Sequence, residues 1–265
     1  MRLTEQFDAG VRALPLGFRL LRTPGVPARL TVPLLFTLVI YGGTLMLTLP
    51  SLLDWIASLR DGAPGWVLEW FGWMITAVQF LLAALLVLLV GWVGVLVAST
   101  LASPFYGQIA GIIETRLTGR APRTNRSLAA EIGAGLVREM QKLAWALPRF
   151  LAVLLLSFVP GVNVIAAPLS FLLGAWIMAV QFADFTPENN GLPFKETRAT
   201  LARRRALTLG FGVPTAVGIG IPLVNLLVAP AAVAGGTALW LRASGAWDGF
   251  SGLKETAEPV APSAR

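Results

Sequence analysis

Four long stretches without a charged residue constrain this chain more than any other feature. They cover residues 30–53, 70–113, 150–183 and 206–241. A charge at the centre of a bilayer costs on the order of 3 kcal/mol, and a helix that crosses the hydrocarbon needs about 20 residues. Uncharged stretches of this length are therefore typical of membrane helices. With 55% hydrophobic and 13% charged residues, the composition agrees, and we expect an all-α integral membrane protein.

The first two stretches predict one spanning helix each. Residues 30–53 give 24 uncharged positions, which suit a single pass. Within the second stretch, the compact apolar run predicts a span at about 73–101. Because proline disfavours a helical residue before it, Pro104 predicts a break there, either a non-helical residue before the proline or a kink in the helix.

The third and fourth stretches, with 34 and 36 positions, are too long for one pass and too short for two, which need roughly 44 residues with a turn. Each contains a Pro-x-x-Asn break, which ends at Asn163 in the first and at Asn225 in the second. We expect two re-entrant helical hairpins, at about 150–183 and 206–241, that turn near half depth. A displacement of 62 residues superimposes the two breaks, and such repeats of broken helices are common in transporters.

Charge placement predicts the topology. The connector 54–69 has a net charge of −2, whereas the whole chain carries +7. By the positive-inside rule, that connector lies outside, and both termini and the connectors 114–149 and 184–205 are cytoplasmic. The basic block of Arg198, Arg203, Arg204 and Arg205 fits either a cluster that gathers anions at a pore mouth or a topology anchor.

The remaining segments complete a single membrane domain over 1–245. Apolar residues recur every three or four positions near the N-terminus, which predicts an amphipathic helix lying along the lipid headgroups; they are Phe7, Val11, Leu14, Phe18 and Leu21. A second helix is expected from a cap at Ser127 to Pro148. Residues 246–265 form an expected disordered tail.

Residue types that are missing exclude much chemistry. The chain has no Cys and no His, so thiol nucleophiles, zinc ribbons and histidine-based triads are excluded, and no phosphate-binding P-loop motif occurs. We therefore expect no enzyme activity, no cofactor and no metal site. The basic connectors are short and tethered at both ends, so nucleic acid is not an expected partner.

Asn163 and Asn225 are candidates for contact with a solute. A helix that starts at each turn would direct backbone N–H groups and the positive end of its dipole towards an anion. The alternative is that each Asn is an ordinary helix cap.

Four sequence blocks resemble a known family. They are ASPFYGQIAGIIETRLTG, REMQKLAWALPR, DFTPENNGLPFKETRATLARRR and IPLVNLLVAPAAVAGGTALW. The chain resembles the CysZ-type sulfate permeases of bacterial inner membranes, which are related to the etoposide-induced-protein domain. The resemblance implies two spanning helices with two half-penetrating hairpins, a homo-oligomer in the bacterial inner membrane, and sulfate entry that feeds cysteine synthesis.

The resemblance also implies an anion site. In the family, backbone N–H groups and two adjacent arginines hold the anion directly after a Pro-Gly-x sequence. Here the sequence Pro24-Gly25-Val26 matches, but the next two residues are a proline and an alanine. We expect the anion at Gly25, Val26 and Arg29, with Arg22 as a second cation. The connector departs as well, with Thr186 and Asn190 where the family has proline and histidine.

Two functions remain open at this stage. The first is a multi-pass permease or channel for a small inorganic anion, foremost sulfate, that works without ATP hydrolysis. The second is a non-transporting membrane scaffold or assembly factor that kept the fold and lost the anion site.

Overall fold

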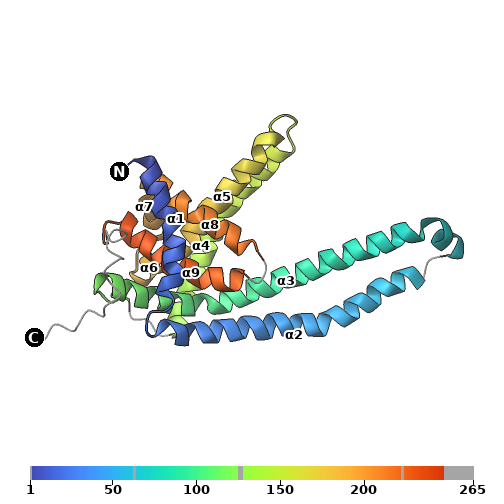
Figure 1. Ribbon diagram of the computed structural model, residues 1–265, viewed down its shortest axis with the longest axis horizontal. Helices are drawn as coiled ribbons and strands as arrows, with labels where there is room; N and C mark the ends of the chain where they lie inside the picture. Colours follow the sequence, from blue (N-terminus) through green and yellow to red (C-terminus); the bar gives the residue numbers. More distant parts are fainter. Residues whose placement is uncertain (1, 62–63, 125–127, 222–223, 248–265) are drawn as a thin grey trace, which may run out of the picture. The chain divides into compact units, whose positions relative to one another are not determined.

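The computed structural model describes residues 2–61, 64–124, 128–221 and 224–247, apart from some side chains within 32–45, 59–68, 86–104 and 128–132. Within these ranges every regular element is a helix, which confirms the all-α fold (Figure 1). The helices are α1 (Leu3–Leu20), α2 (Val26–Asp61), α3 (Gly65–Thr118), α4 (Leu128–Ser157), α5 (Asn163–Ala183), α6 (Phe185–Asn189), α7 (Phe194–Arg203), α8 (Arg205–Ile219) and α9 (Asn225–Ala243). The expected tail lies outside the described residues from position 248 onwards.

The chain forms two compact units. One unit comprises Thr31–Ser103, that is, most of α2 and α3, and the other comprises Met1–Leu30 with Pro104–Arg265. In the first unit, the side-chain amide of Gln79 on α3 donates a 2.7 Å hydrogen bond to the carbonyl of Ile56 on α2. The single membrane domain over 1–245 stays a prediction.

The two predicted spans, 30–53 and 73–101, lie inside α2 and α3, so their helical structure is confirmed. At 1.5 Å per residue, the 36 residues of α2 reach about 54 Å, well beyond a hydrocarbon core of about 30 Å. That these helices cross a membrane stays a prediction. The connector expected over 54–69 is mostly helical, because α2 continues to Asp61 and α3 begins at Gly65.

Pro104 does not end a helix, and the residue before it is helical, because α3 runs on to Thr118. The alternative, a kink at Pro104, stays a prediction. Membrane helices tolerate proline because neighbouring groups and local adjustments satisfy the carbonyl that loses its partner. The proposed end at Pro148 is wrong, since α4 continues through this residue to Ser157. Its expected cap, Ser127, lies outside the described residues.

Helices α1, α5, α8 and α9 form the centre of the larger unit, and glycines let their backbones touch. A Cβ atom on Gly17 of α1 would collide with the carbonyl of Ala231 on α9, and one on Gly235 of α9 would collide with the carbonyl of Ala13 on α1. Helix α8 meets α5 similarly, where a Cβ on Gly212 would strike the carbonyl of Ala175. Small residues at helix interfaces permit this close approach in membrane proteins.

The N-terminal helix is confirmed, and one of its faces packs on the protein; that its large apolar residues lie along the headgroups stays a prediction. Helix α1 packs against α8 and α9 through a face that contains Gly10, Ala13 and Gly17. Phe7 and Phe18, predicted to rest on the headgroups, are exposed. The periodicity of large apolar residues does not reveal this face because the contact with the core depends on small ones.

Two helical hairpins occur at the predicted places. Helices α4 and α8 end 62 residues apart, at Ser157 and Ile219, and the returning helices α5 and α9 begin 62 residues apart, at Asn163 and Asn225. The predicted repeat is thus present in the backbone. The surroundings differ, because α9 is largely buried within the unit whereas the turn of the α4–α5 hairpin is exposed. Figure 1 shows this hairpin projecting from the helices around α1.

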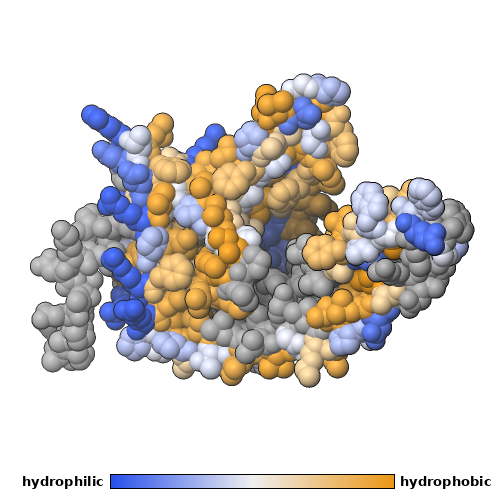
Figure 2. Space-filling view, turned by 45° about the vertical axis from the view of Figure 1, so that its right-hand side comes forward, coloured by the Kyte–Doolittle hydropathy of each residue, from blue (hydrophilic) through white to orange (hydrophobic). Residues whose placement is uncertain are grey.

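Three helical segments in the described residues are long and apolar enough to cross a membrane: Gly133–Ser157, Asn163–Asn189 and Asn225–Ala243. The first two form the projecting hairpin, whose large apolar side chains are exposed; Phe158 and Val164 near its turn are 76% and 77% exposed. Figure 2 shows hydrophobic side chains over much of the visible face. Apolar surface of this extent is typical of a protein that contacts lipid. The half depth of both hairpins stays a prediction.

Candidate anion site at the start of α2

The predicted anion site is a tight turn followed by the first turn of a helix. Helix α1 ends at Leu20, and α2 begins at Val26. Gly25 has φ = +88°, a backbone conformation that residues with a Cβ rarely adopt. A Cβ at this position would also lie 3.3 Å from Nη1 of Arg29. Glycine therefore allows both the turn and the close contact with the guanidinium group.

Two protein oxygens hold the Arg29 side chain. Its Nη1 donates to the carbonyl oxygen of Gly25 at 3.0 Å, and its Nε donates to Oε1 of Gln108 on α3 at 3.2 Å. A guanidinium group has five N–H donors in a rigid plane, so further donors remain for a ligand. Arg29 is exposed. The structure thus places one oriented cation at the surface, beside the N-terminus of a long helix.

The backbone donors of this turn are fewer than the resemblance implies. Val26 is fully buried, and its N–H donates to the carbonyl of Thr23 at 3.0 Å. Pro27 has no N–H to offer. Arg22 is exposed on the preceding turn, and none of the hydrogen bonds described joins its side chain to Gly25 or Arg29. Arg29 is therefore the cation best placed to meet an anion here.

The part of α3 that carries Gln108 is fixed by the end of α6. The amide Nδ2 of Asn189 donates to the carbonyl of Gly107 at 2.6 Å. Nδ2 of Asn190 donates to both carboxylate oxygens of Glu114, at 2.8 and 3.1 Å. Burial raises the pKa of the Glu114 carboxyl above its usual value, while the bond from Asn190 and the charge of Arg123 oppose the rise. Asn190 therefore has a structural role.

The two Asn residues at the hairpin turns are not helix caps. The cap positions are Val162 and Val224, and Asn163 and Asn225 are the first helical residues of α5 and α9. Their backbone N–H groups already donate to the carbonyls of Val159 and Ile221, at 3.0 and 3.1 Å. Only their side-chain amides are thus available for a solute. Asn163 is exposed, and Asn225 is half-buried.

A buried ionic cluster joins α4 to the end of α5. Asp184 is completely buried and accepts two bonds from Arg138, from Nε at 2.8 Å and from Nη2 at 2.7 Å. Lys142 lies 3.4 Å from the same carboxylate and 2.9 Å from Glu139. The side chain of Lys142 is 7% exposed, because its position on α4 faces α5 rather than water, whereas the side chain of Glu139 is 37% exposed.

Comparison with known proteins identifies the family. The family described as Sulfate transporter CysZ/Etoposide-induced protein 2.4 matches residues 13–230. The chain belongs to this family. It is 36% identical over 237 residues to the Sulfate transporter CysZ of Salmonella typhimurium, which covers 88% of this chain and 92% of that relative, and a relative of the same description in Salmonella typhi matches equally.

The predicted residues Gly25, Val26 and Arg29 do lie together. The sequence did not indicate Gln108 or Asp184, each of which acts on an arginine from a different part of the chain. A buried arginine needs a carboxylate partner, and this rule is the one signal that could have indicated Asp184.

Proposed function

We propose that this protein transports sulfate across a membrane without ATP hydrolysis or any chemistry on the solute, and that Arg29 is the cation that meets the anion. The observation that carries the proposal is the 36% identity to sulfate transporters over 88% of the chain. The oriented guanidinium of Arg29 supports it from the structure. Guanidinium groups bind tetrahedral oxyanions through paired, charge-assisted hydrogen bonds.

The geometry suggests how Arg29 would act. The Gly25 carbonyl and Gln108 each accept one of its N–H groups, so they fix the plane of the guanidinium and leave its other donors for sulfate. The positive end of the α2 dipole adds a favourable potential close by. Arg22 would contribute long-range attraction rather than a direct bond.

The wider setting belongs to the same proposal. The protein would be a multi-pass homo-oligomer in the bacterial inner membrane, and sulfate entry would supply cysteine synthesis. Asn163 and Asn225 would line the path through their side-chain amides, which are small neutral donors suited to a mobile anion.

Sulfate uptake tests this proposal. The purified protein is reconstituted into liposomes, and entry of radiolabelled sulfate is compared for the wild type, Arg29→Ala and Arg29→Lys. We expect uptake above empty liposomes, a loss of about tenfold or more in Arg29→Ala, and partial recovery in Arg29→Lys because a point charge replaces the planar donor set. Arg120→Ala, which removes another exposed arginine, is the matched control and should leave uptake unchanged.

The alternative makes the opposite prediction. Arg29 has lost the neighbouring arginine that the family pattern contains, which favours a scaffold without an anion site. In that case wild-type uptake equals that of empty liposomes, and the Arg29 variants change nothing.

A further inference from the structure

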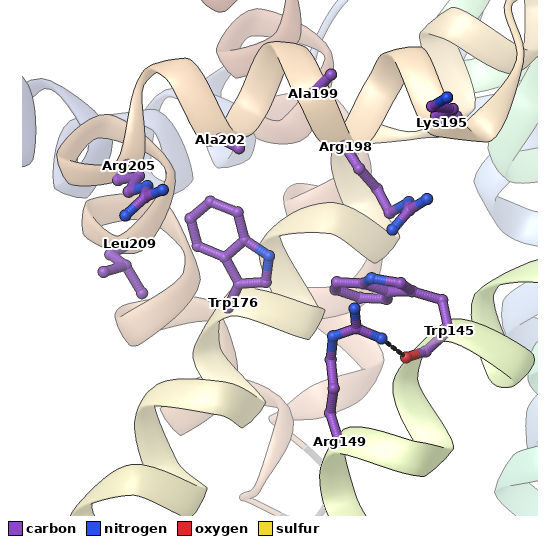
Figure 3. Close-up of a pocket in the computed structure, with 9 residues that line it drawn as sticks. All are labelled: Trp145, Arg149, Trp176, Lys195, Arg198, Ala199, Ala202, Arg205 and Leu209. Atoms are coloured by element: carbon purple, nitrogen blue, oxygen red, sulfur yellow. Dashed lines mark hydrogen bonds between the residues drawn. The ribbon is translucent and has the colours of Figure 1, made fainter.

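A second basic site lies apart from Arg29. A pocket of about 610 Å³ opens between the apolar arms of α4 and α5 and the polar helix α7, with the start of α8 at its edge (Figure 3). Four cations line it, Arg149, Lys195, Arg198 and Arg205, and no carboxylate is among the lining residues. None of the four forms an ion pair in the part of the chain that the structure describes. Only two members of the basic block expected from sequence contribute.

Two of the four cations lie over the ring of Trp145. The guanidinium carbons of Arg149 and Arg198 lie 4.7 and 5.4 Å from the ring centroid of Trp145. Figure 3 shows them on opposite sides of this ring, with Trp176 directed towards the same space. Two positive charges beside one ring repel each other, and the ring faces compensate this only in part. An anion in the pocket would relieve the repulsion.

One donor in this group has no partner. The Nε atom of Arg198 is buried and forms no hydrogen bond with any described residue. Buried polar atoms in folded proteins nearly always have a partner, so an unsatisfied donor among unpaired cations points to a missing acceptor. An oxyanion supplies both the acceptor and the negative charge.

The position of the pocket along the chain indicates its depth in the bilayer. Arg149 is the last charge before the uncharged residues 150–183, and Arg205 is the last before 206–241. Where such segments enter the hydrocarbon, flanking arginines and tryptophans lie at the level of the lipid headgroups. Phe150 and Leu151, next to Arg149, are 43% and 48% exposed. A phosphate in the pocket would thus have an apolar helix surface beside it for acyl chains.

We propose that this pocket binds a tetrahedral oxyanion, the phosphate of an anionic phospholipid headgroup, through Arg149, Lys195, Arg198 and Arg205. The phosphate oxygens accept hydrogen bonds from the guanidinium groups, and the tryptophans exclude water from them. This site is independent of transport through Arg29. Free sulfate offers the same tetrahedral chemistry, so the test separates the two sources.

Native mass spectrometry of the full chain in detergent tests the lipid. Phosphatidylglycerol and phosphatidylcholine are added in equal amounts, and the lipid retained on each protein variant is counted. The wild type should retain phosphatidylglycerol in preference. Arg149→Gln/Arg198→Gln should reduce this retention about tenfold or more, as expected for the loss of two charge-assisted bonds. Because Arg198 also packs on Phe194, the exposed pair Lys195→Gln/Arg205→Gln serves as a second variant that leaves this packing intact.

Controls and a second ligand decide the outcome. Arg12→Gln/Arg116→Gln removes two exposed cations outside the pocket and should retain phosphatidylglycerol like the wild type. Sodium sulfate is titrated calorimetrically into the same variants in an Arg29→Ala background. One outcome is that the wild type shows no lipid preference and that only the pocket variants abolish sulfate binding. This would overturn the assignment of the pocket to a lipid phosphate and support a site for the free oxyanion. Equal lipid retention and equal sulfate binding in all variants would overturn the site altogether.

Discussion

Substitution of Asp184 by Asn should destabilise the fold strongly. The Asp184 carboxylate is completely buried and accepts bonds from Nε and Nη2 of Arg138 at 2.8 and 2.7 Å, with Lys142 at 3.4 Å. Asparagine keeps the shape but removes the charge, and its NH₂ group would face a guanidinium donor. The buried Arg138 would then lack its counter-charge, and Lys142 would keep only Glu139.

The expected size follows from this burial. Breaking a buried pair by removing one partner costs about 3–5 kcal/mol, because the remaining charge stays in a medium of low dielectric constant. Glu139→Gln is the matched control. Glu139 contacts the same Lys142 at 2.9 Å, but its side chain is 37% exposed. Water and salt screen such a pair, so its loss should cost at most about 1 kcal/mol.

The measurement is the free energy of unfolding of the full chain in mixed detergent micelles, with increasing denaturing detergent. We expect Asp184→Asn to shift the transition far more than Glu139→Gln. Equal shifts would show that Asp184 is hydrated and that the ionic cluster does not hold α4 against α5, and the reasoning would be refuted.

Two further predictions use the same unfolding measurement. Gly17→Ala should lower the free energy of unfolding by about 1–3 kcal/mol, because its methyl group would collide with the Ala231 carbonyl on α9. The control Gly133→Ala, whose methyl group meets no atom within 4 Å, should be neutral or slightly stabilising. A comparable loss of stability in both variants would contradict the close contact. Because burial raises the pKa of Glu114 in the folded protein above its unfolded value, protonation favours the native state. The free energy of unfolding should therefore rise as the pH falls through the folded pKa, with the full gain present below the unfolded pKa, and Glu114→Gln should remove this contribution. An identical pH profile in wild type and variant would be the contrary result.

The sequence predicts well those parts of the fold that depend on local patterns. The long uncharged stretches predicted α2 and α3. The two Pro-x-x-Asn breaks predicted both hairpin turns, because α5 and α9 begin at the Asn of each break. The same turns show where local reasoning ends. Asn163 and Asn225 follow the capping position because the turn carbonyls already accept their backbone N–H groups, which residue preference alone does not indicate.

Contacts between distant residues were beyond prediction. Arg138 and Asp184 are 46 positions apart. The local sequence of α4 does not show that α5 buries its charged residues. Arg29 meets Gln108 across 79 positions. Helices α3 and α4 continue through Pro104 and Pro148 because a proline penalty of a few kcal/mol is smaller than what packing or lipid supplies to a long apolar helix.

Glycines set the distance between the central helices, and this limits which parts of the protein can move. Where a backbone touches the next backbone, as at Gly17 and Gly212, there is no layer of side chains that could change rotamer to let one helix slide past another. A shift by a single residue, about 1.5 Å, would already bring a methyl group against a carbonyl. We expect α1, α5, α8 and α9 to behave as a rigid frame during any transport cycle, so that opening and closing motions fall to segments outside these contacts.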